Sequence, residues 1–265
     1  MIDKDLFRRD ILSVRERVPL VLNLTNFVAM TPSANALLAI GASPVISSCV
    51  EEMPELVRES DAVVINIGCL DRFQVEAMRL AASVASAADI PWVLDPVGAG
   101  ATRLRTDVSL ELARSFYPAV IRGNASEIMA LAGDGTGTRG VDSRHNSVDA
   151  VMAARSLANQ MKTVVSVSGE VDYITDGERI EMVSNGNPLM SRVTAMGCIA
   201  TALTAAVTAV DRDYMTAATN AMALMGTVGE VASEGCRGTG SFFVNFMDCL
   251  SSATPSQLSG MIINR

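Results

Sequence analysis

Cys198 stands at a position suited to chemistry. It follows Gly197 in the segment TAMGC (194–198) and opens a stretch rich in Ala and Thr that predicts a helix. The N–H groups of a first helical turn have no partners within the helix, and with the helix dipole they attract anions and lower the pKa of a thiol. The segment therefore predicts an oxyanion site with a reactive thiol, and a small buried cysteine is the structural alternative.

Two carboxylates occupy positions that suit a metal–phosphate cluster. Asp95 ends the apolar run 92–95, and Glu127 stands three residues after Asn124 at the start of a predicted helix. A turn aspartate and a capping-box glutamate are the structural alternatives. Carboxylates at adjacent strand ends nevertheless suit Mg²⁺, which takes few protein oxygens besides phosphate and water. We therefore expect Asp95 and Glu127 to organise Mg²⁺ and phosphate.

An arginine and a glycine-rich loop extend the set of candidate anion contacts. Arg122 closes the apolar run 119–122, where a lone arginine is costly without an anionic partner. The loop VGAGATR (97–103) lacks the Lys-Ser/Thr of a P-loop and resembles a phosphate cradle only weakly. His145 is the single histidine, which argues against Ser-His-Asp and Cys-His catalysis.

The elements that must position these residues alternate between strands and helices. Apolar runs rich in β-branched residues predict parallel strands covered on both faces, at 20–24, 62–67, 92–95, 119–122 and 163–167. Helical stretches lie between them, at 31–40, 72–88, 106–114, 125–132 and 147–160. This alternation predicts a doubly wound, mostly parallel α/β sheet with helices on both faces. Ligands bind such a sheet beyond the carboxyl ends of its strands.

Other local signals refine this architecture. Thr106 and Ser147 are expected helix N-caps, and the TDG within 172–183 predicts a hairpin that forms an antiparallel edge. The C-terminal third is expected to be mostly helical. Because no linker or repeat marks a boundary, we expect residues 1–265 to form a single domain.

The composition narrows the function classes. A net charge of −8 without a block of Lys or Arg argues against nucleic-acid binding. The five cysteines lack the spacing of a zinc or redox pair, which suits free thiols in a reducing cytosol. The N-terminus has no apolar signal core, and 197–210 and 214–232 contain polar residues, so we expect buried helices rather than membrane spans. The sequence thus predicts a cytoplasmic protein without membrane or nucleic-acid partners.

Taken in order along the chain, these motifs resemble those of the hydroxyethylthiazole kinases, a family of ribokinase-like small-molecule kinases. The most specific pieces are NLTNFV, ANALLAIGASPV, INIGCL, DPVGAGATRLR, IRGNASEI, GVDS, NGNP, TAMGC and GTGSF, and the resemblance covers almost the whole chain. It implies a ribokinase-like fold and phosphorylation of the hydroxyethyl arm of 5-(2-hydroxyethyl)-4-methylthiazole by ATP and Mg²⁺, in thiamine biosynthesis or salvage. It also implies a homotrimer whose substrate site lies near the subunit interface.

The resemblance further implies residue roles. The thiazole contacts would come from Asn26, Val28, Ile46, Gly68 and Ala195. The ATP contacts would come from Arg122, Ser168 and Gly197. Asp95 and Glu127 would organise Mg²⁺ and phosphate. Cys198 would be the catalytic residue, placed near the substrate hydroxyl and able to accept its proton.

The chain departs from the family pattern at a few positions. Ile46 replaces a methionine, Asn187 replaces a histidine and Ser168 replaces a threonine whose hydroxyl it keeps. Ala195 and Met196 stand in the anion-hole segment that usually reads TG-x-GC. Alanine is unfavourable at a positive φ where glycine is not, so we expect this loop to be shaped differently.

Three other functions remain open from the sequence. They are a kinase for another small heteroaromatic alcohol, a nucleotide-dependent dehydratase on a related scaffold, and a nucleotide-binding regulator without turnover. Asn26 and Ile46 suit a small heteroaromatic ring better than a polyol. Such dehydratases carry an aspartate where Cys198 stands, and the retained Asp95 and Arg122 argue against a regulator.

Overall fold

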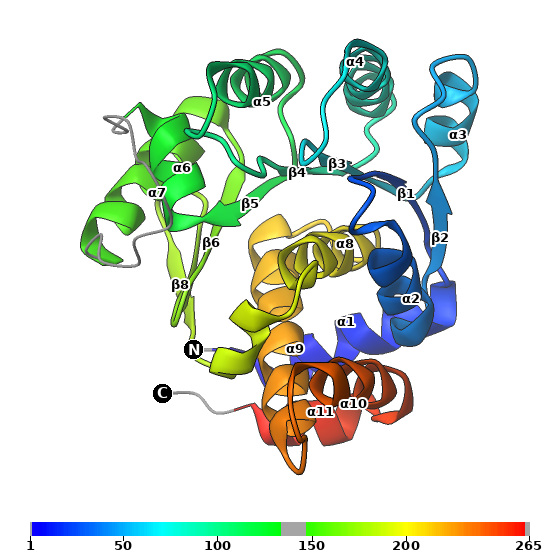
Figure 1. Ribbon diagram of the computed structural model, residues 1–265, viewed down its shortest axis with the longest axis vertical. Helices are drawn as coiled ribbons and strands as arrows, with labels where there is room; N and C mark the ends of the chain where they lie inside the picture. Colours follow the sequence, from blue (N-terminus) through cyan, green and yellow to red (C-terminus); the bar gives the residue numbers. More distant parts are fainter. Residues whose placement is uncertain (1, 134–146, 263–265) are drawn as a thin grey trace.

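The protein is built on one eight-stranded sheet (Figure 1). The computed structural model describes residues 2–133 and 147–262. The strands are β1 (Leu20–Leu24), β2 (Ser43–Ile46), β3 (Ala62–Asn66), β4 (Trp92–Asp95), β5 (Val120–Asn124), β6 (Val164–Ser168), β7 (Asp172–Thr175) and β8 (Ile180–Val183). Their order across the sheet is β2-β1-β3-β4-β5-β6-β7-β8.

The sheet is parallel from β2 to β6 and antiparallel at its far edge. β7 pairs antiparallel with both β6 and β8, and the turn between β7 and β8 contains Asp176 and Gly177, so the predicted hairpin is confirmed. β2 was not predicted, because it is short, begins Ser43-Pro44 and is only half-buried throughout. Strand runs buried on one side only lack the continuous apolar signal that identified the central strands.

Helices cover both faces of the sheet, as expected (Figure 1). One face carries α3 (Met53–Glu59), α4 (Arg72–Ala87), α5 (Arg103–Phe116), α6 (Ala125–Ala132) and α7 (Ser147–Met161). The other carries α1 (Lys4–Arg17), α2 (Met30–Ile40), α8 (Met196–Thr208), α9 (Tyr214–Ser233), α10 (Thr239–Ser252) and α11 (Pro255–Met261). A short 3₁₀ helix, η1 (Pro188–Arg192), precedes α8.

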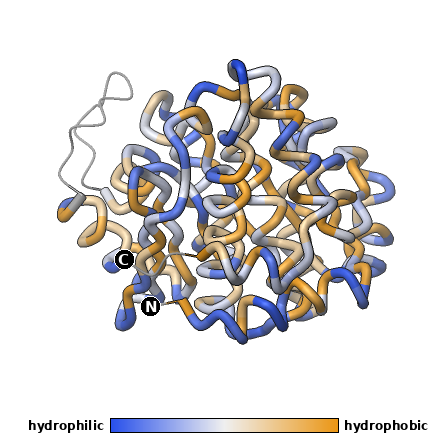
Figure 2. The backbone as a smooth tube through the Cα atoms, turned by 90° about the horizontal axis from the view of Figure 1, so that it is seen from below, coloured by the Kyte–Doolittle hydropathy of each residue, from blue (hydrophilic) through white to orange (hydrophobic). Residues whose placement is uncertain are grey.

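Two apolar cores hold these layers together. One lies between the sheet and the side that carries α8 and α9, and its buried members include Phe7, Ile199 and Phe242. The other lies under α4, α5 and α7, and it includes Trp92 and Leu112. Figure 2 shows hydrophilic segments gathered on the outer loops. This arrangement fits a sheet whose strands are apolar on both faces.

The helix boundaries follow local capping chemistry. Asp71 accepts hydrogen bonds from the first amides of α4, and Gly41 takes a left-handed conformation at the end of α2. The prediction of Thr106 as an N-cap is wrong. Thr102 caps α5 instead, and the Thr106 hydroxyl accepts a hydrogen bond from the Gly100 amide. α7 is described from Ser147 onward, and His145 lies outside the described residues, so the prediction of Ser147 as an N-cap stays a prediction.

Two broader expectations concern membrane-spanning helices and the number of domains. Within residues 2–133 and 147–262, no helix combines the length and the apolar character that a membrane crossing needs. The single-domain organisation stays a prediction.

Candidate active site

The carboxyl ends of the parallel strands bring the predicted residues to one edge of the sheet. The register places Asn66 of β3 opposite Asp95 of β4, and Asn124 of β5 opposite Ser168 of β6. Ile46 ends β2 at the same edge, where it pairs with Asn23 of β1. Residues far apart in the sequence therefore meet where open α/β sheets bind their ligands.

Asp95 is a buried carboxylate linked to two neighbours. Its Oδ2 accepts hydrogen bonds from Asn66 Nδ2 at 2.6 Å and from the Thr201 hydroxyl of α8 at 2.8 Å. Burial raises the pKa of Asp95 to about 6, and the charge of Glu127 adds to this, while Arg122 and the two hydrogen bonds oppose it. A carboxylate kept in such a place at a cost to folding is typical of a functional site.

Cys198 lies within reach of two asparagine amides at the tip of α8. Its sulfur accepts hydrogen bonds from Asn66 Nδ2 at 3.2 Å and Asn26 Nδ2 at 3.4 Å. The expectation of a lowered thiol pKa is wrong. Burial and the charge of Asp95 raise the pKa of Cys198 to about 11, against the opposing effect of the two amides and Arg122. Cys198 is therefore a thiol at neutral pH.

Glu127 caps α6 and also holds the loop after β4. One carboxylate oxygen accepts the Asn124 amide at 2.8 Å, which completes a capping box with the Asn124 side chain. The other oxygen accepts the Gly98 amide at 2.9 Å. The capping-box alternative is thus present. The carboxylate also lies close enough to Asp95 to raise its pKa.

Arg122 joins β5 to the tip of α8. Its Nη1 donates to the Gly197 carbonyl at 3.1 Å, and its buried Nε has no hydrogen-bond partner in the described chain. A Cβ at Gly197 would stand 2.9 Å from Nη1, so a larger residue there would displace the end of the Arg122 side chain. The guanidinium acts on two buried carboxyls, Asp95 and Asp172. An arginine with an unpaired buried N–H is prepared to bind an anion.

The remaining predicted residues surround this centre. Ala195 has φ 67°, so it takes the left-handed conformation that glycine adopts more readily, and the expectation of a differently shaped loop stays a prediction. Ser168 ends β6, and its hydroxyl donates to the Gly123 carbonyl. Val28 is 60% exposed, and Ile46 at the end of β2 is half-buried.

Two glycines, one in the turn after β3 and one in the loop after β4, lie in close contact with neighbouring side chains. A Cβ at Gly68 would lie 2.7 Å from Asn26 Nδ2 and 2.9 Å from Asn66 Oδ1. Gly98 has φ +76° and packs against Arg105. The Arg105 guanidinium donates to the carbonyls of Ile67, Val97 and Gly68, and so ties the turn after β3 to the loop after β4.

Sequence reasoning missed three residues of this site. Asn66 and Thr201 contact Asp95, and Asp172 closes the turn after β6 by accepting the Gly169 amide at 2.9 Å. Burial raises the pKa of Asp172 to about 6 against the pull of Gly169 and Arg122. The available signal was a polar residue at the end of an apolar strand, which Asn66 provides.

The donor set fits a magnesium ion carried by a nucleotide. Within the described ranges, no three His, Cys, Asp or Glu side chains gather to hold a metal ion by themselves. Asp95 Oδ1 accepts no hydrogen bond from the described chain, whereas both oxygens of Glu127 accept backbone amides. Mg²⁺ in kinases uses one or two carboxylates and completes its shell with phosphate and water. One available buried carboxylate and a second one nearby suit this mode.

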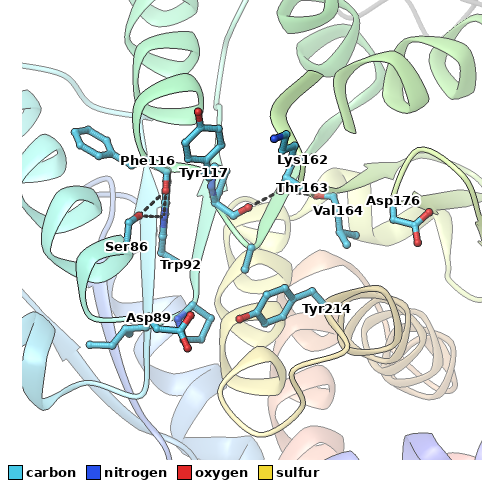
Figure 3. Close-up of a pocket in the computed structure, with 14 residues that line it drawn as sticks. Ser86, Asp89, Trp92, Phe116, Tyr117, Lys162, Thr163, Val164, Asp176 and Tyr214 are labelled. Atoms are coloured by element: carbon cyan, nitrogen blue, oxygen red, sulfur yellow. Dashed lines mark hydrogen bonds between the residues drawn. The ribbon is translucent and has the colours of Figure 1, made fainter. Parts of the chain in front are cut away.

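A cavity elsewhere contains none of the predicted site residues. It measures about 450 Å³ and lies at the opposite edge of the sheet, where β4, β5 and β6 begin (Figure 3). Trp92 and Phe116 line it, and the indole N–H donates to the Phe116 carbonyl at 3.2 Å. The converging polar groups therefore identify the carboxyl edge as the candidate site.

Comparisons with known proteins agree with this geometry. Residues 11–256 match the hydroxyethylthiazole kinase family. The chain is 48% identical to a hydroxyethylthiazole kinase from Nitratidesulfovibrio vulgaris over 92% of this chain and 91% of that protein. It is 46% identical to one from Pyrococcus furiosus over 92% of each.

Solved structures share the architecture. The hydroxyethylthiazole kinase protein of Pyrococcus horikoshii superposes with a TM-score of 0.87 at 43% identity and 94% coverage of both chains. The pyridoxal kinase of Staphylococcus aureus superposes with a TM-score of 0.61 at 16% identity, over 80% of this chain and 88% of that one, which shows a shared fold alone. The fold is therefore ribokinase-like, and the chain belongs to the hydroxyethylthiazole kinase family.

Proposed function

We propose that this kinase transfers the γ-phosphoryl group of ATP to the hydroxyl of 5-(2-hydroxyethyl)-4-methylthiazole. One observation carries the proposal: Asn66 links the buried carboxylate of Asp95 to the Cys198 thiol at the tip of α8. The proposed metal-binding carboxylate, the N-terminus of α8 and the thiol that would contact the alcohol are therefore next to one another. The names of the relatives supply the alcohol.

The tip of α8 and Arg122 hold the phosphoryl group. Phosphoryl transfer depends on alignment and charge neutralisation more than on covalent help. Arg122 is fixed by the Gly197 carbonyl and retains free N–H groups, so it stabilises negative charge on the transferred group. Ala195 turns the chain so that the amides of the first α8 turn face the same point. Ser168 contributes a hydroxyl to the nucleotide side.

Asp95 and Glu127 organise the metal ion. When bound with ATP, Mg²⁺ neutralises charge on the phosphates. Asp95 offers it an oxygen without a hydrogen-bond partner in the described chain. Glu127 keeps its hydrogen bonds to the Gly98 and Asn124 amides and so fixes the loop at Gly98. It acts on the metal ion through its charge rather than by direct contact.

The thiazole lies beside the end of β1. Asn26 and Gly68 form its inner wall, and Val28 and Ile46 provide apolar contacts. The strong exposure of Phe27 (68%) and Val28 (60%) beside Asn26 supports a second subunit that covers this pocket, and we propose the homotrimer on that ground. The cytoplasmic location and the absence of nucleic-acid partners stay predictions.

The experiment incubates the purified protein with Mg-ATP and the thiazole alcohol and follows ADP and the thiazole phosphate. We expect equimolar formation of the two products and dependence on Mg²⁺. A pyrimidine alcohol and a hydrated nicotinamide cofactor serve as comparison substrates. A higher kcat/KM for either one, or ADP without thiazole phosphate, would overturn the proposal.

A further inference from the structure

Two buried asparagines use all their hydrogen-bonding capacity around the Cys198 sulfur. Asn66 Nδ2 donates to Asp95 Oδ2 at 2.6 Å and to the sulfur at 3.2 Å. Asn66 Oδ1 accepts Asn26 Nδ2 at 3.0 Å and the Gly68 amide at 2.9 Å. An amide side chain has two hydrogens to donate and two lone pairs to accept with, so Asn66 is saturated.

Asn26 is saturated in the same way. Its Nδ2 donates to Asn66 and to the Cys198 sulfur, and its Oδ1 accepts the amides of Val28 and Ala29, each at 3.1 Å. Turning this amide over would set its N–H groups against two backbone N–H donors. Turning Asn66 over would aim its carbonyl at the Asp95 carboxylate. Chemistry therefore fixes the direction of both amides.

This direction determines how the sulfur is used. Because both asparagines donate to it, the sulfur accepts hydrogen bonds on the side that faces the sheet. The thiol hydrogen must then point away from Asn26 and Asn66. Cys198 donates no hydrogen bond to the described residues, and its side chain is only partly buried, so the S–H is left for a ligand.

We infer that Asn66, together with Asn26, is a positioning residue that turns the Cys198 S–H toward the hydroxyl oxygen of the substrate. In this arrangement Cys198 donates a hydrogen bond that orients one lone pair of the hydroxyl and leaves another free to meet the phosphoryl group, while the hydroxyl proton passes to an oxygen of the transferred phosphoryl group. The cysteine is not the proton acceptor, in agreement with its raised pKa. This inference rests on the proposed function for the identity of the alcohol.

The position of Asp95 explains why the amide is needed at 66. An aspartate there would lose both N–H donors and would face the Asp95 carboxylate directly. The Asn66 amide can therefore donate both to the thiol sulfur and to the Asp95 carboxylate. A carboxylate at position 66 could donate to neither and would repel Asp95.

The first test is spectroscopic and needs no turnover. The Raman S–H stretching band of Cys198 is isolated as the difference between the wild type and Cys198→Ala, which removes the other four cysteines from the comparison. We expect a narrow band in the ligand-free protein and a broadened band in Asn66→Ala. The thiazole alcohol without ATP should shift the wild-type band to lower wavenumber, and Asn66→Ala should shift less. Asn23→Ala removes a buried asparagine of β1 whose side chain, among the described residues, hydrogen-bonds only the Val21 carbonyl, and it should behave as the wild type.

The second test is kinetic. Since loss of one oriented hydrogen bond is worth about tenfold in rate, Asn66→Ala and Cys198→Ala should each lower kcat about tenfold, with KM for ATP nearly unchanged. Cys198→Ser keeps a donor and should lie closer to the wild type than Cys198→Ala. Circular dichroism confirms folding of each variant, and Asn26→Ala, which removes the other amide donor to the sulfur, replaces Asn66→Ala if the latter fails to fold.

The outcomes distinguish a failure of the positioning role of Asn66 from a failure of the proposed function. A band that does not move although calorimetry shows the alcohol bound overturns the inference, as does equal loss of activity in the serine and alanine variants. A protein that binds no thiazole alcohol overturns the proposed function. The ligand-free bands still test the positioning role, because a band equally narrow in Asn66→Ala would contradict it.

Discussion

Replacing Asp95 by asparagine should stabilise the protein while it removes activity. Burial raises the pKa of this carboxyl from 3.8 to about 6. At 1.36 kcal/mol for each pH unit, the ionised form costs folding about 3 kcal/mol above pH 6. An asparagine oxygen can accept the same hydrogen bonds from Asn66 and Thr201 without a charge. For a chain of this size the gain corresponds to a rise in Tm of about 5–6 °C.

The sign of the pH dependence follows from the raised pKa. The folded state holds the proton of Asp95 more tightly than the unfolded state does, so the penalty is complete above pH 6 and disappears as the pH falls toward 3.8. The stability difference between Asp95→Asn and the wild type should therefore be near its maximum at pH 8 and approach zero at pH 4.

Urea unfolding of both proteins between pH 4 and pH 8, in EDTA and without nucleotide, measures this difference. Asp71→Asn serves as the matched control, because the same exchange at an exposed N-cap should change stability by only a few tenths of a kcal/mol. A destabilised Asp95→Asn at pH 8, or a difference that does not change with pH, would refute the reasoning. A thiazole kinase assay at pH 8 with Mg²⁺ and without EDTA should show the loss of activity in the same protein preparation.

Three further changes test other parts of the site. Gly197→Ala places a Cβ 2.9 Å from Arg122 Nη1, so KM for ATP should rise about tenfold in steady-state kinetics, and an unchanged KM would contradict the role of this contact. Ala195→Gly removes a left-handed alanine and should raise the free energy of unfolding by about 0.5–1 kcal/mol in urea titrations; a loss of stability would show that the turn is not strained. Cys198→Ala should keep about a tenth of kcat, whereas Glu127→Ala, which frees the amides of Asn124 and Gly98, should lose at least about 100-fold. The reverse order in the same assay would overturn this ranking.

Much of the fold follows from short-range patterns. The central strands are apolar on both faces and therefore stand out as continuous runs, and the TDG turn identifies the hairpin of β7 and β8. β2 escapes because it is half-buried and contains Pro44. α5 begins earlier than expected because Thr102, rather than Thr106, supplies the cap. Boundaries of this kind depend on which of two similar side chains reaches the backbone.

The site was predictable where motif and strand end coincide. Asp95 and Arg122 were predicted from their positions at strand ends and Glu127 from the helix start that follows Asn124, and the structure brings Arg122 and Glu127 within electrostatic reach of Asp95. The chemistry of Cys198 was not predictable, because the pKa depends on burial and on Asp95, which is distant in sequence. Asn66 was missed although it ends an apolar strand, because its partners Asp95 and Cys198 are distant in sequence.

The Arg105 guanidinium connects the two loops that follow β3 and β4. It holds three carbonyls from the two loops that follow β3 and β4, and these loops carry Gly68 on the alcohol side and Gly98 on the metal side. A shift of either loop is transmitted to the other through this one side chain. In the function that we propose, the loop beside the alcohol and the loop beside the metal ion are therefore connected through one guanidinium.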